Sequence, residues 1–255
     1  MTEFATATDG VRIAYEWAGE GPPVVLVHGF GSSRVQNWKS TGWYDSLNEG
    51  GFSVLAIDCR GHGESDKPHD PLFYHHDRMA EDVATVMDAA GVARAPYIGY
   101  SMGGLIGLRF LAHFSERAPR LVLGGVGEAY LNGPRVSDPE RRNMIADALL
   151  AENKDGIPDP RARMFRDFAD QPGKDRLALA ACMRAMTPPL PREALQKFII
   201  PVLVVCGDQD NVSGAPGPLA ATFPHGSAQI VPGRDHMSAV GARLTRQAAV
   251  DFLKC

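Results

Sequence analysis

A pentapeptide between a strand-like and a helix-like apolar run limits what this chain can fold into more than any other feature. Residues 99–103, with the sequence GYSMG, follow the apolar residues 95–98 and precede the apolar residues 105–111. The pattern is typical of a G-x-S-x-G elbow, in which a buried strand turns sharply into a helix at the serine. Glycines flank the serine in such a turn because side chains there would collide with the neighbouring strand and helix.

The serine of such an elbow is held in an unfavourable backbone conformation that pushes its hydroxyl out above the sheet. The next amide, that of Met102, would then lie at a helix N-terminus, where free N–H groups and the helix dipole favour an anion. We therefore interpret Ser101 as a candidate nucleophile and the amide of Met102 as one donor of an oxyanion hole. A plain glycine-rich turn is the alternative interpretation, and the motif alone does not decide between the two.

Strand-like and helix-like segments alternate along the chain, which predicts an α/β fold with a mainly parallel sheet wound by helices on both faces. An initial hairpin is expected at residues 4–8 and 11–17, with Asp9 and Gly10 in its turn. Later apolar runs predict buried strands, and the runs between them predict helices. The later strands are expected at residues 24–27, 52–57, 95–98, 121–126, 201–206 and 228–231, and helices at residues 38–47, 78–90, 105–111 and 242–254.

The loop after the first of these buried strands is the expected source of a second oxyanion donor. Residues 28–31, with the sequence HGFG, follow that strand, and glycines at such a place let the backbone approach a ligand closely. The amide of Phe30 matches the donor that the loop after the third strand supplies in a nucleophile-elbow fold. A glycine turn without such a role is the alternative.

An acid and a base follow the last two predicted strands, in the chain order Ser, Asp, His expected for this elbow. Asp208 and Asp210 follow the first of these strands, and His236 follows the second. Because ligands bind at the carboxyl ends of parallel strands, we expect these groups to meet Ser101 at one edge of the sheet. A serine hydroxyl needs such a base, and the base needs a carboxylate to orient it.

Other polar motifs are interpreted as structural. Asp58 and Arg60 are expected to pair locally in a turn, and His62 is interpreted as part of that turn rather than as a base. The neighbouring His75 and His76 do not share a helix face, so a solvated loop explains them better than a metal site.

Residues 128–197 differ in character from the rest of the chain. Strand-like runs vanish, prolines and charges become frequent, and helices are expected at residues 140–152, 160–169 and 174–185. We predict a helical cap over the top edge of the sheet, inserted into a core made of residues 1–127 and 198–255.

The apolar side chains of the predicted cap are candidates for lining a substrate pocket, although their spacing is equally typical of plain helix packing. They are Met144, Ile145, Leu149, Met164, Phe165, Phe168, Met183 and Met186. The arginines of the cap are candidates for recognising a substrate carboxylate, but a solvated cap surface is their expected role. They are Arg141, Arg142, Arg161, Arg163 and Arg166.

These segments together resemble the α/β-hydrolase-fold serine hydrolases, an esterase- and lactonase-like superfamily, over essentially the whole chain. The resemblance rests on residues 24–31, 58–65, 99–104, 201–210 and 233–236. In that superfamily the strand before the acid typically ends in a G-x-x-D pattern. The pattern here falls on Gly207 and Asp210, which makes Asp208 the lesser alternative, although the proline that often follows the acid has no close counterpart. His236 resembles the base of the family in a G-x-x-H turn.

The resemblance implies a serine hydrolase that cleaves a small to medium carboxylic ester or lactone through an acyl-enzyme. Ser101, Asp210 and His236 would form its catalytic triad, and the amides of Phe30 and Met102 its oxyanion hole. The same triad serves C–C bond hydrolases and perhydrolases, and other members of the superfamily bind ligands or signal with slow turnover. All of these stay open as alternatives. No metal or organic cofactor is implied, because the chemistry is complete without one.

Charge and composition argue against other classes of protein. A net charge of -4 offers no basic footprint for nucleic acid and no polybasic surface for anionic lipid. The N-terminus lacks a signal-peptide pattern, and no apolar run approaches the roughly 18 residues of a membrane span. The four cysteines are isolated, so reduced thiols in a cytoplasmic protein are the simplest account. We expect a small-molecule substrate and neither a nucleic-acid nor a membrane partner, and the oligomeric state is open.

Overall fold

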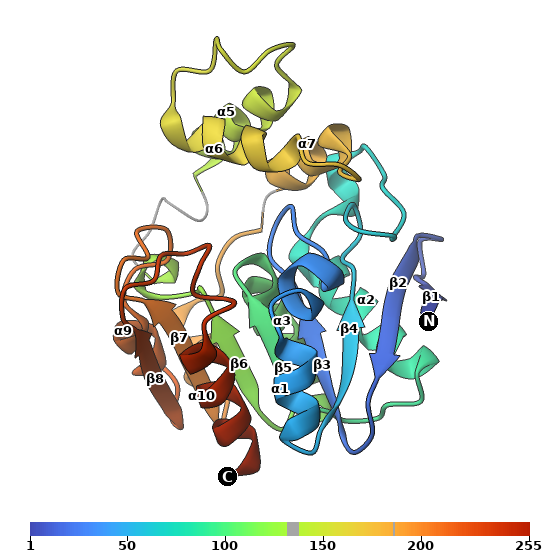
Figure 1. The fold of residues 1–255 in the computed structure, drawn as a ribbon, viewed down its shortest axis with the longest axis vertical. Helices are drawn as coiled ribbons and strands as arrows, with labels where there is room; N and C mark the ends of the chain where they lie inside the picture. The colour runs from blue at the N-terminus through green and yellow to red at the C-terminus, as the bar shows by residue number, and fades with distance from the viewer. Residues whose placement is uncertain (132–137, 186) are drawn as a thin grey trace.

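One sheet organises the chain and lies between two layers of helices (Figure 1). The computed structural model describes residues 1–131, 138–185 and 187–255, and within them eight strands form the sheet in the order β1-β2-β4-β3-β5-β6-β7-β8. Strand β2 runs antiparallel to β1 and β4, and the other neighbouring pairs are parallel. This confirms the mainly parallel sheet. The strands are β1 (Thr2–Thr6), β2 (Arg12–Ala18), β3 (Pro23–Val27), β4 (Ser53–Ile57), β5 (Tyr97–Tyr100), β6 (Leu121–Gly124), β7 (Val202–Gly207) and β8 (Gly226–Val231).

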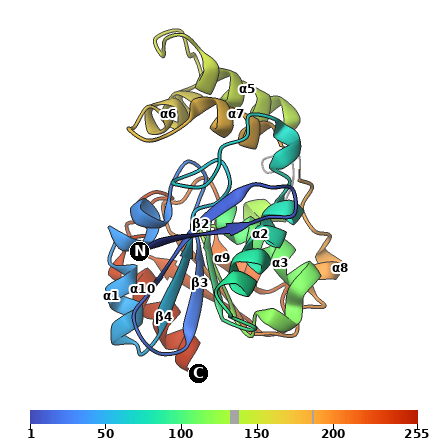
Figure 2. The same ribbon diagram turned by 90° about the vertical axis from the view of Figure 1, so that its right-hand side faces the viewer.

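Alternate residues of the central strands pack against helices on opposite faces of the sheet. In β3, Val24 and Leu26 face the layer of α1 and α10, whereas Val25 and Val27 face the layer of α2, α3 and α9 (Figures 1 and 2). Burial on both faces explains why these strands are continuous apolar runs. The helices of these layers and their connections are α1 (Trp43–Glu49), α2 (His76–Ala89), α3 (Met102–Phe114), α8 (Arg192–Leu195), α9 (Pro216–Ala220) and α10 (Arg243–Lys254), with the short turns η1 (Val35–Lys39), η2 (Pro71–Phe73), η3 (Ser115–Arg117) and η4 (Glu128–Tyr130).

The prediction of a single helix over residues 38–47 is wrong. The structure instead has a short π-helix, η1, and α1 begins only at Trp43. Gly42 stands between the two elements with a φ of 80°, a left-handed conformation that interrupts a helix and favours glycine. Trp38 and Trp43 meet edge to face across this break, with their ring centroids 5.2 Å apart. The buried tryptophan pair therefore packs the break itself against the sheet.

Three further helices lie beyond the carboxyl ends of the strands in both views (Figures 1 and 2). They are α5 (Pro139–Leu150), α6 (Pro160–Ala169) and α7 (Arg176–Arg184). Each begins at an aspartate, because Asp138, Asp159 and Asp175 accept hydrogen bonds from amides of the first helical turn. The three helices share an apolar cluster of their own that includes Ile145 and Leu149. Among the described residues, no helix has both the length and the apolar character that crossing a membrane requires.

Candidate active site

Ser101 occupies a strained elbow between β5 and α3. Its φ is 50°, and within the described residues no other non-glycine residue has a positive φ. A side chain on either flanking glycine would collide with backbone: a Cβ on Gly99 would lie 2.3 Å from the Gly103 oxygen, and one on Gly103 would lie 2.0 Å from the Val27 oxygen. The structure therefore confirms that a side chain at either position would clash with its neighbours, and this explains why both residues are glycine.

His236 lies after β8 and contacts the hydroxyl of Ser101. Its Nε2 is 3.0 Å from Ser101 Oγ, and its Nδ1 is 2.8 Å from Asp210 Oδ2. An ionised carboxylate can only accept, so Nδ1 carries the proton and Nε2 is free to accept a hydrogen bond from the serine hydroxyl. The Tyr100 hydroxyl donates to the His236 carbonyl over 2.5 Å, which holds this turn against the elbow.

Asp210 is buried at the end of β7 and is surrounded by donors. Besides His236, it accepts from the amides of Val212 and Ser213, each over 2.9 Å, and from the Ser213 hydroxyl. Burial by itself would raise the pKa of this carboxyl, but the hydrogen bonds and charge of His236, together with the Ser213 hydrogen bonds, outweigh it and hold the pKa below its usual range. The alternative acid, Asp208, is exposed and accepts from the Gly233 amide instead. The structure thus brings Asp210, and not Asp208, to His236.

Two amides beside Ser101 donate to no acceptor in the described part of the chain, those of Phe30 and Met102. Met102 is the first residue of α3, where amides lack partners within the helix. Gly29, just before Phe30, lies against the elbow, because a Cβ there would be 3.4 Å from Ser101 Cβ. The structure thus places both predicted donors next to the candidate nucleophile.

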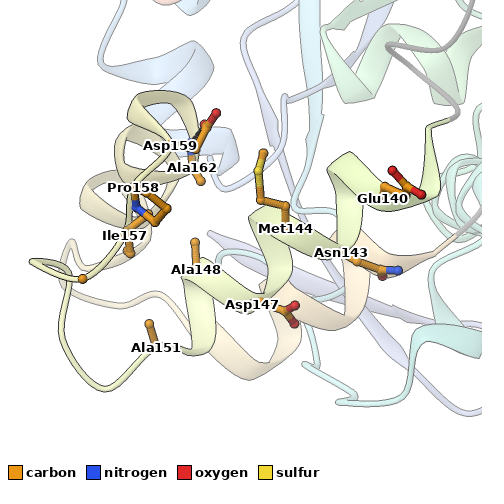
Figure 3. Close-up of a pocket in the computed structure, with 11 residues that line it drawn as sticks. Glu140, Asn143, Met144, Asp147, Ala148, Ala151, Ile157, Pro158, Asp159 and Ala162 are labelled. Carbon is orange, nitrogen blue, oxygen red and sulfur yellow. Dashed lines mark hydrogen bonds between the residues drawn. The ribbon is translucent and has the colours of Figure 1, made fainter.

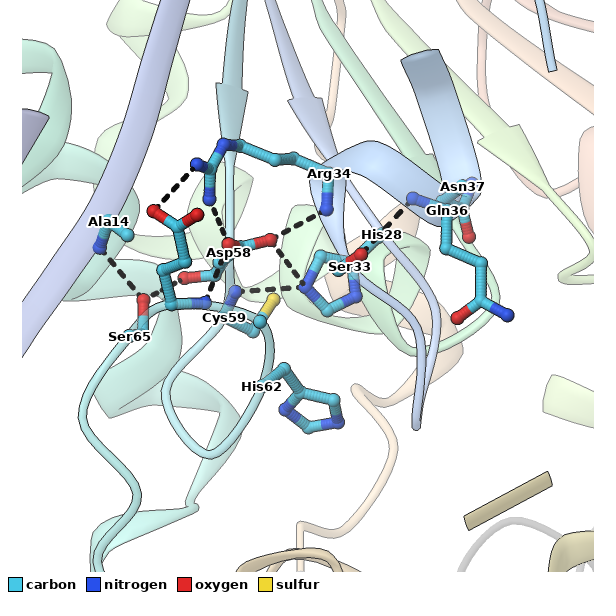
Figure 4. Close-up of polar contacts among 12 residues, drawn as sticks. Ala14, His28, Ser33, Arg34, Gln36, Asn37, Asp58, Cys59, His62 and Ser65 are labelled. Carbon is cyan, nitrogen blue, oxygen red and sulfur yellow. Dashed lines mark hydrogen bonds and ion pairs between the residues drawn. The ribbon is translucent and has the colours of Figure 1, made fainter. Parts of the chain in front are cut away.

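His28 orients the peptide between Gly29 and Phe30. Its Nε2 accepts from the Cys59 amide over 3.0 Å (Figure 4). Its Nδ1 therefore carries the proton and donates to the Gly29 carbonyl over 2.7 Å. In a trans peptide the N–H points opposite to the C=O, so the Phe30 amide points away from His28. Burial lowers the pKa of His28 to about 4, which keeps the ring neutral. Our sequence prediction gave His28 no role, and its position at the end of β3 was the only signal.

Behind His28 lies a buried network centred on Asp58 (Figure 4). Asp58 pairs with the guanidinium of Arg34 and accepts from the Arg34 amide over 2.6 Å. The local pair predicted between Asp58 and Arg60 is therefore wrong. Arg60 points to the other side of the turn, where Asp82 and Asp9 bind its fully buried guanidinium. A guanidinium donates from several nitrogens, so a buried arginine pairs with the carboxylates that surround the group in space and not with the one nearest in sequence.

Helices α6 and α7 contact the loop of residues 28–31 and the first residue of α3. The Phe165 ring of α6 lies edge to face with Phe30, with centroids 5.7 Å apart, and a Cβ on Gly31 would be 2.9 Å from the Phe168 ring. Cys182 Sγ of α7 is 3.8 Å from Met102 Sδ. Apolar side chains of α6 and α7 therefore pack on the two residues whose amides are the candidate oxyanion donors.

Other apolar residues of the predicted cap do not share this position. Met144 and Met164 are 38% and 42% exposed, whereas Ile145 and Leu149 pack inside the cluster of α5 to α7. Met186 lies outside the described residues. Among the predicted surface arginines, Arg163 is exposed as expected. Arg166 differs, because it is buried and donates to the backbone carbonyls of Ala148 in α5 and Ala151 just after that helix.

A separate hollow of about 490 Å³ lies between α5 and α6 (Figure 3). Met144, Ala148, Ile157 and Asp159 contribute to its walls, and none of the triad candidates lines it. This hollow is therefore separate from the candidate triad. In the described residues, no group of three or more histidine, cysteine or acidic side chains is arranged to hold a metal ion.

Comparison with known proteins identifies the fold family. The sequence profile of the α/β-hydrolase fold family matches residues 22–155, more than half of the chain. The chain belongs to the α/β-hydrolase fold family. It is 29% identical to the non-heme chloroperoxidase CPO-A1 of Kitasatospora aureofaciens over 259 aligned residues, which cover 90% of this chain and 87% of that one.

Two further proteins show the same level of sequence identity to this chain. 3-Oxoadipate enol-lactonase 2 of Acinetobacter baylyi is 29% identical over 173 residues, 64% of this chain and 63% of the lactonase. The crystal structure of a hydrolase from Pseudomonas aeruginosa PA01 superposes with a TM-score of 0.81 at 29% identity, covering 100% of this chain and 98% of the other.

Proposed function

We propose that this α/β-hydrolase is a serine hydrolase that cleaves a small to medium carboxylic ester or lactone through an acyl-enzyme on Ser101. The observation that carries the proposal is the continuous chain from Ser101 Oγ to His236 Nε2 at 3.0 Å and from His236 Nδ1 to Asp210 at 2.8 Å, which starts at a strained elbow. The similarity to an enol-lactonase supports the lactone part of the proposal.

In the first step Ser101 Oγ attacks the carbonyl carbon of the substrate while His236 Nε2 takes the hydroxyl proton. The negative charge that develops on the carbonyl oxygen is stabilised by the amides of Phe30 and Met102. The bond to the leaving oxygen then breaks, and that oxygen takes the proton from His236. An acyl group stays on Ser101.

In the second step a water molecule attacks the acyl carbon while His236 takes one of its protons, and the Ser101 oxygen leaves with that proton. Asp210 accepts from Nδ1 throughout, which keeps the imidazole in the required tautomer and stabilises its charged form. Its lowered pKa fits this part, because the carboxyl stays ionised while His236 takes and returns the proton.

Residues 128–197 act as a cap in this proposal, over a core made of residues 1–127 and 198–255. The Phe30–Phe165 pair and the Cys182–Met102 contact favour an acyl group with apolar surface near the reacting carbonyl. This apolar packing also excludes water, which strengthens the hydrogen bonds to the oxyanion.

Hydrolysis of nitrophenyl esters from acetate to decanoate tests the proposal. We expect Ser101→Ala to lower turnover by about 10⁴–10⁶-fold if the triad acts as a unit. Ser115→Ala, which removes an exposed serine hydroxyl at the far end of α3, is the matched control and should keep the wild-type rate. Equal rates in the wild type and Ser101→Ala would refute the mechanism. A single stoichiometric burst would instead indicate a slow-turnover member of the family.

A further inference from the structure

The α6–α7 turn carries a lysine whose charge has no hydrogen-bonding partner. Lys174 Nζ is buried, and in the described residues no group accepts a hydrogen bond from it. It lies 3.2 Å from the centroid of the Phe168 ring, the same ring that contacts Gly31. A cation–π contact compensates only part of the hydration that a buried ammonium loses.

The turn that holds Lys174 is fastened to the core on both sides. Gln171 accepts from the Gln36 side chain over 2.9 Å, and Asp175 lies 3.0 Å from His69. Lys174 stands between these two anchors, next to the loop of residues 28–31. Burial is the main cause of the low pKa values of His28 and His62, and the positive charge of Lys174 adds to it.

His62, whose ring packs on Phe30 in the same loop of residues 28–31, provides a second observation. The side chain is 3% exposed, and its Nδ1 donates to the Arg60 carbonyl over 2.9 Å. Its Nε2 is therefore an acceptor, and it is buried without a hydrogen-bonding partner in the described part of the chain. The ring lies 5.8 Å from Phe30 and points away from the Asp58 network (Figure 4).

The acidic side chains near this place are already engaged. Asp58 is bound by Arg34, and Asp175 accepts from His69 and from two amides at the start of α7. Neither is left to neutralise Lys174. An unpaired buried charge lowers stability, and unmatched polar groups of this kind are typical of places where a ligand supplies the partner.

We propose that Lys174 binds a carboxylate in the acyl group of the substrate, so that the enzyme prefers esters or lactones of dicarboxylic acids over neutral ones. This inference rests on the proposed function, because it assumes that the ester carbonyl lies at Ser101. The ammonium supplies the charge that the carboxylate needs. The carboxylate has no proton to donate, so His62 Nε2 would take its hydrogen bond from a separate donor on the acyl group, such as a hydroxyl. Lys174 is a binding residue in this proposal and takes no part in bond breaking.

A matched pair of substrates tests the proposal. p-Nitrophenyl hydrogen adipate and p-nitrophenyl hexanoate have acyl chains of equal length and differ in one terminal carboxylate. We expect Lys174→Met to lower the ratio of their kcat/KM values by about 10- to 100-fold, mainly through the KM of the acidic ester. Met keeps an unbranched apolar side chain on the Phe168 ring. Lys174→Arg should keep most of the preference.

Lys154→Met is the control, because Lys154 is an exposed lysine of the same three-helix group, paired with Asp167. It should leave the ratio of the two esters unchanged. If Lys174→Met also leaves the ratio unchanged, the ammonium serves only to pack on Phe168 and the proposal is wrong.

Binding of adipate to Ser101→Ala separates this proposal from the proposed function. By calorimetry, adipate should bind Ser101→Ala more tightly than hexanamide, an uncharged compound with an acyl chain of the same length. A second substitution, Lys174→Met, should remove the difference. If no ester is cleaved but adipate binding depends on Lys174, the anion site stands and the hydrolase proposal fails. If esters are cleaved and adipate binding does not depend on Lys174, only the proposed anion site is refuted.

Discussion

The orientation of the Phe30 amide gives the sharpest test of how the loop after β3 serves catalysis. His28→Leu keeps roughly the volume of the ring but removes both of its hydrogen bonds, 2.7 Å to the Gly29 carbonyl and 3.0 Å from the Cys59 amide. The Gly29–Phe30 peptide is then held less firmly, because among the described residues the Ser32 amide, 3.2 Å away, is the one remaining donor to that carbonyl.

Two magnitudes follow from this change. Turnover should fall by about 10²–10³-fold, the usual effect of losing one oxyanion donor, with KM nearly unchanged because the oxyanion exists only in the transition state. Stability should fall by about 1–3 kcal/mol, because the Cys59 amide stays buried without an acceptor. Steady-state kinetics on the best nitrophenyl ester and urea unfolding measure the two effects separately.

Ser65→Ala is the matched control for this prediction. The Ser65 hydroxyl accepts from the Ala14 amide over 2.8 Å and donates to the Asp58 carbonyl over 2.6 Å, so its loss breaks two buried hydrogen bonds near the Asp58 network, away from Gly29. It should cost similar stability and leave kcat close to the wild-type value. If His28→Leu loses stability but keeps kcat, the Phe30 amide does not depend on His28 and our reasoning is wrong.

Two further predictions concern the acid and the buried histidines. Asp210→Asn should lower kcat by about 10⁴-fold, because the asparagine favours the wrong imidazole tautomer. Asp208→Asn, which changes the exposed alternative acid, should keep wild-type kinetics. A normal kcat in Asp210→Asn would exclude Asp210 as the acid that orients His236. Stability should decline as pH falls from 6.5, because the folded chain keeps His28 and His62 neutral with pKa values of about 4 and about 3 while the unfolded chain protonates both. Below pH 6.5, each histidine lowers the free energy of unfolding by up to about 1.4 kcal/mol per pH unit. Urea unfolding at neutral and at mildly acidic pH should therefore show a smaller loss of stability in His62→Asn than in the wild type. An equal loss would contradict the assignment of His62 as a histidine that the fold keeps neutral.

The positions of the three triad candidates were predictable because each follows the end of an apolar strand. Parallel strands end at one edge of the sheet. Residues as far apart in the sequence as Ser101 and His236 can therefore meet there, although no sequence motif links them. The choice between Asp208 and Asp210 needed the family pattern. Physically, it depends on which carboxylate the turn after β7 buries, and composition does not reveal that.

Other features could not be predicted, because their partners are distant in the sequence. Asp58 pairs with Arg34 across two loops, and local spacing suggested Arg60 instead. A lysine in a polar turn is normally solvated, so no sequence pattern indicates that Lys174 is covered by the packing of α6 on the loop of residues 28–31. The break at Gly42 is visible as a glycine, but only tertiary packing of the two tryptophans determines that the helix stops there.

Covalent labelling with a fluorophosphonate, followed by intact-mass and peptide mass spectrometry, tests the central claim most directly. Such a reagent reacts with a serine only where a base activates the hydroxyl and donors stabilise the resulting anion. We predict a single adduct per chain, on the peptide that contains Ser101, and no adduct in Ser101→Ala. A wild-type chain that stays unlabelled, or a Ser101→Ala variant that is labelled at the wild-type rate, would contradict the assignment of Ser101 as the nucleophile.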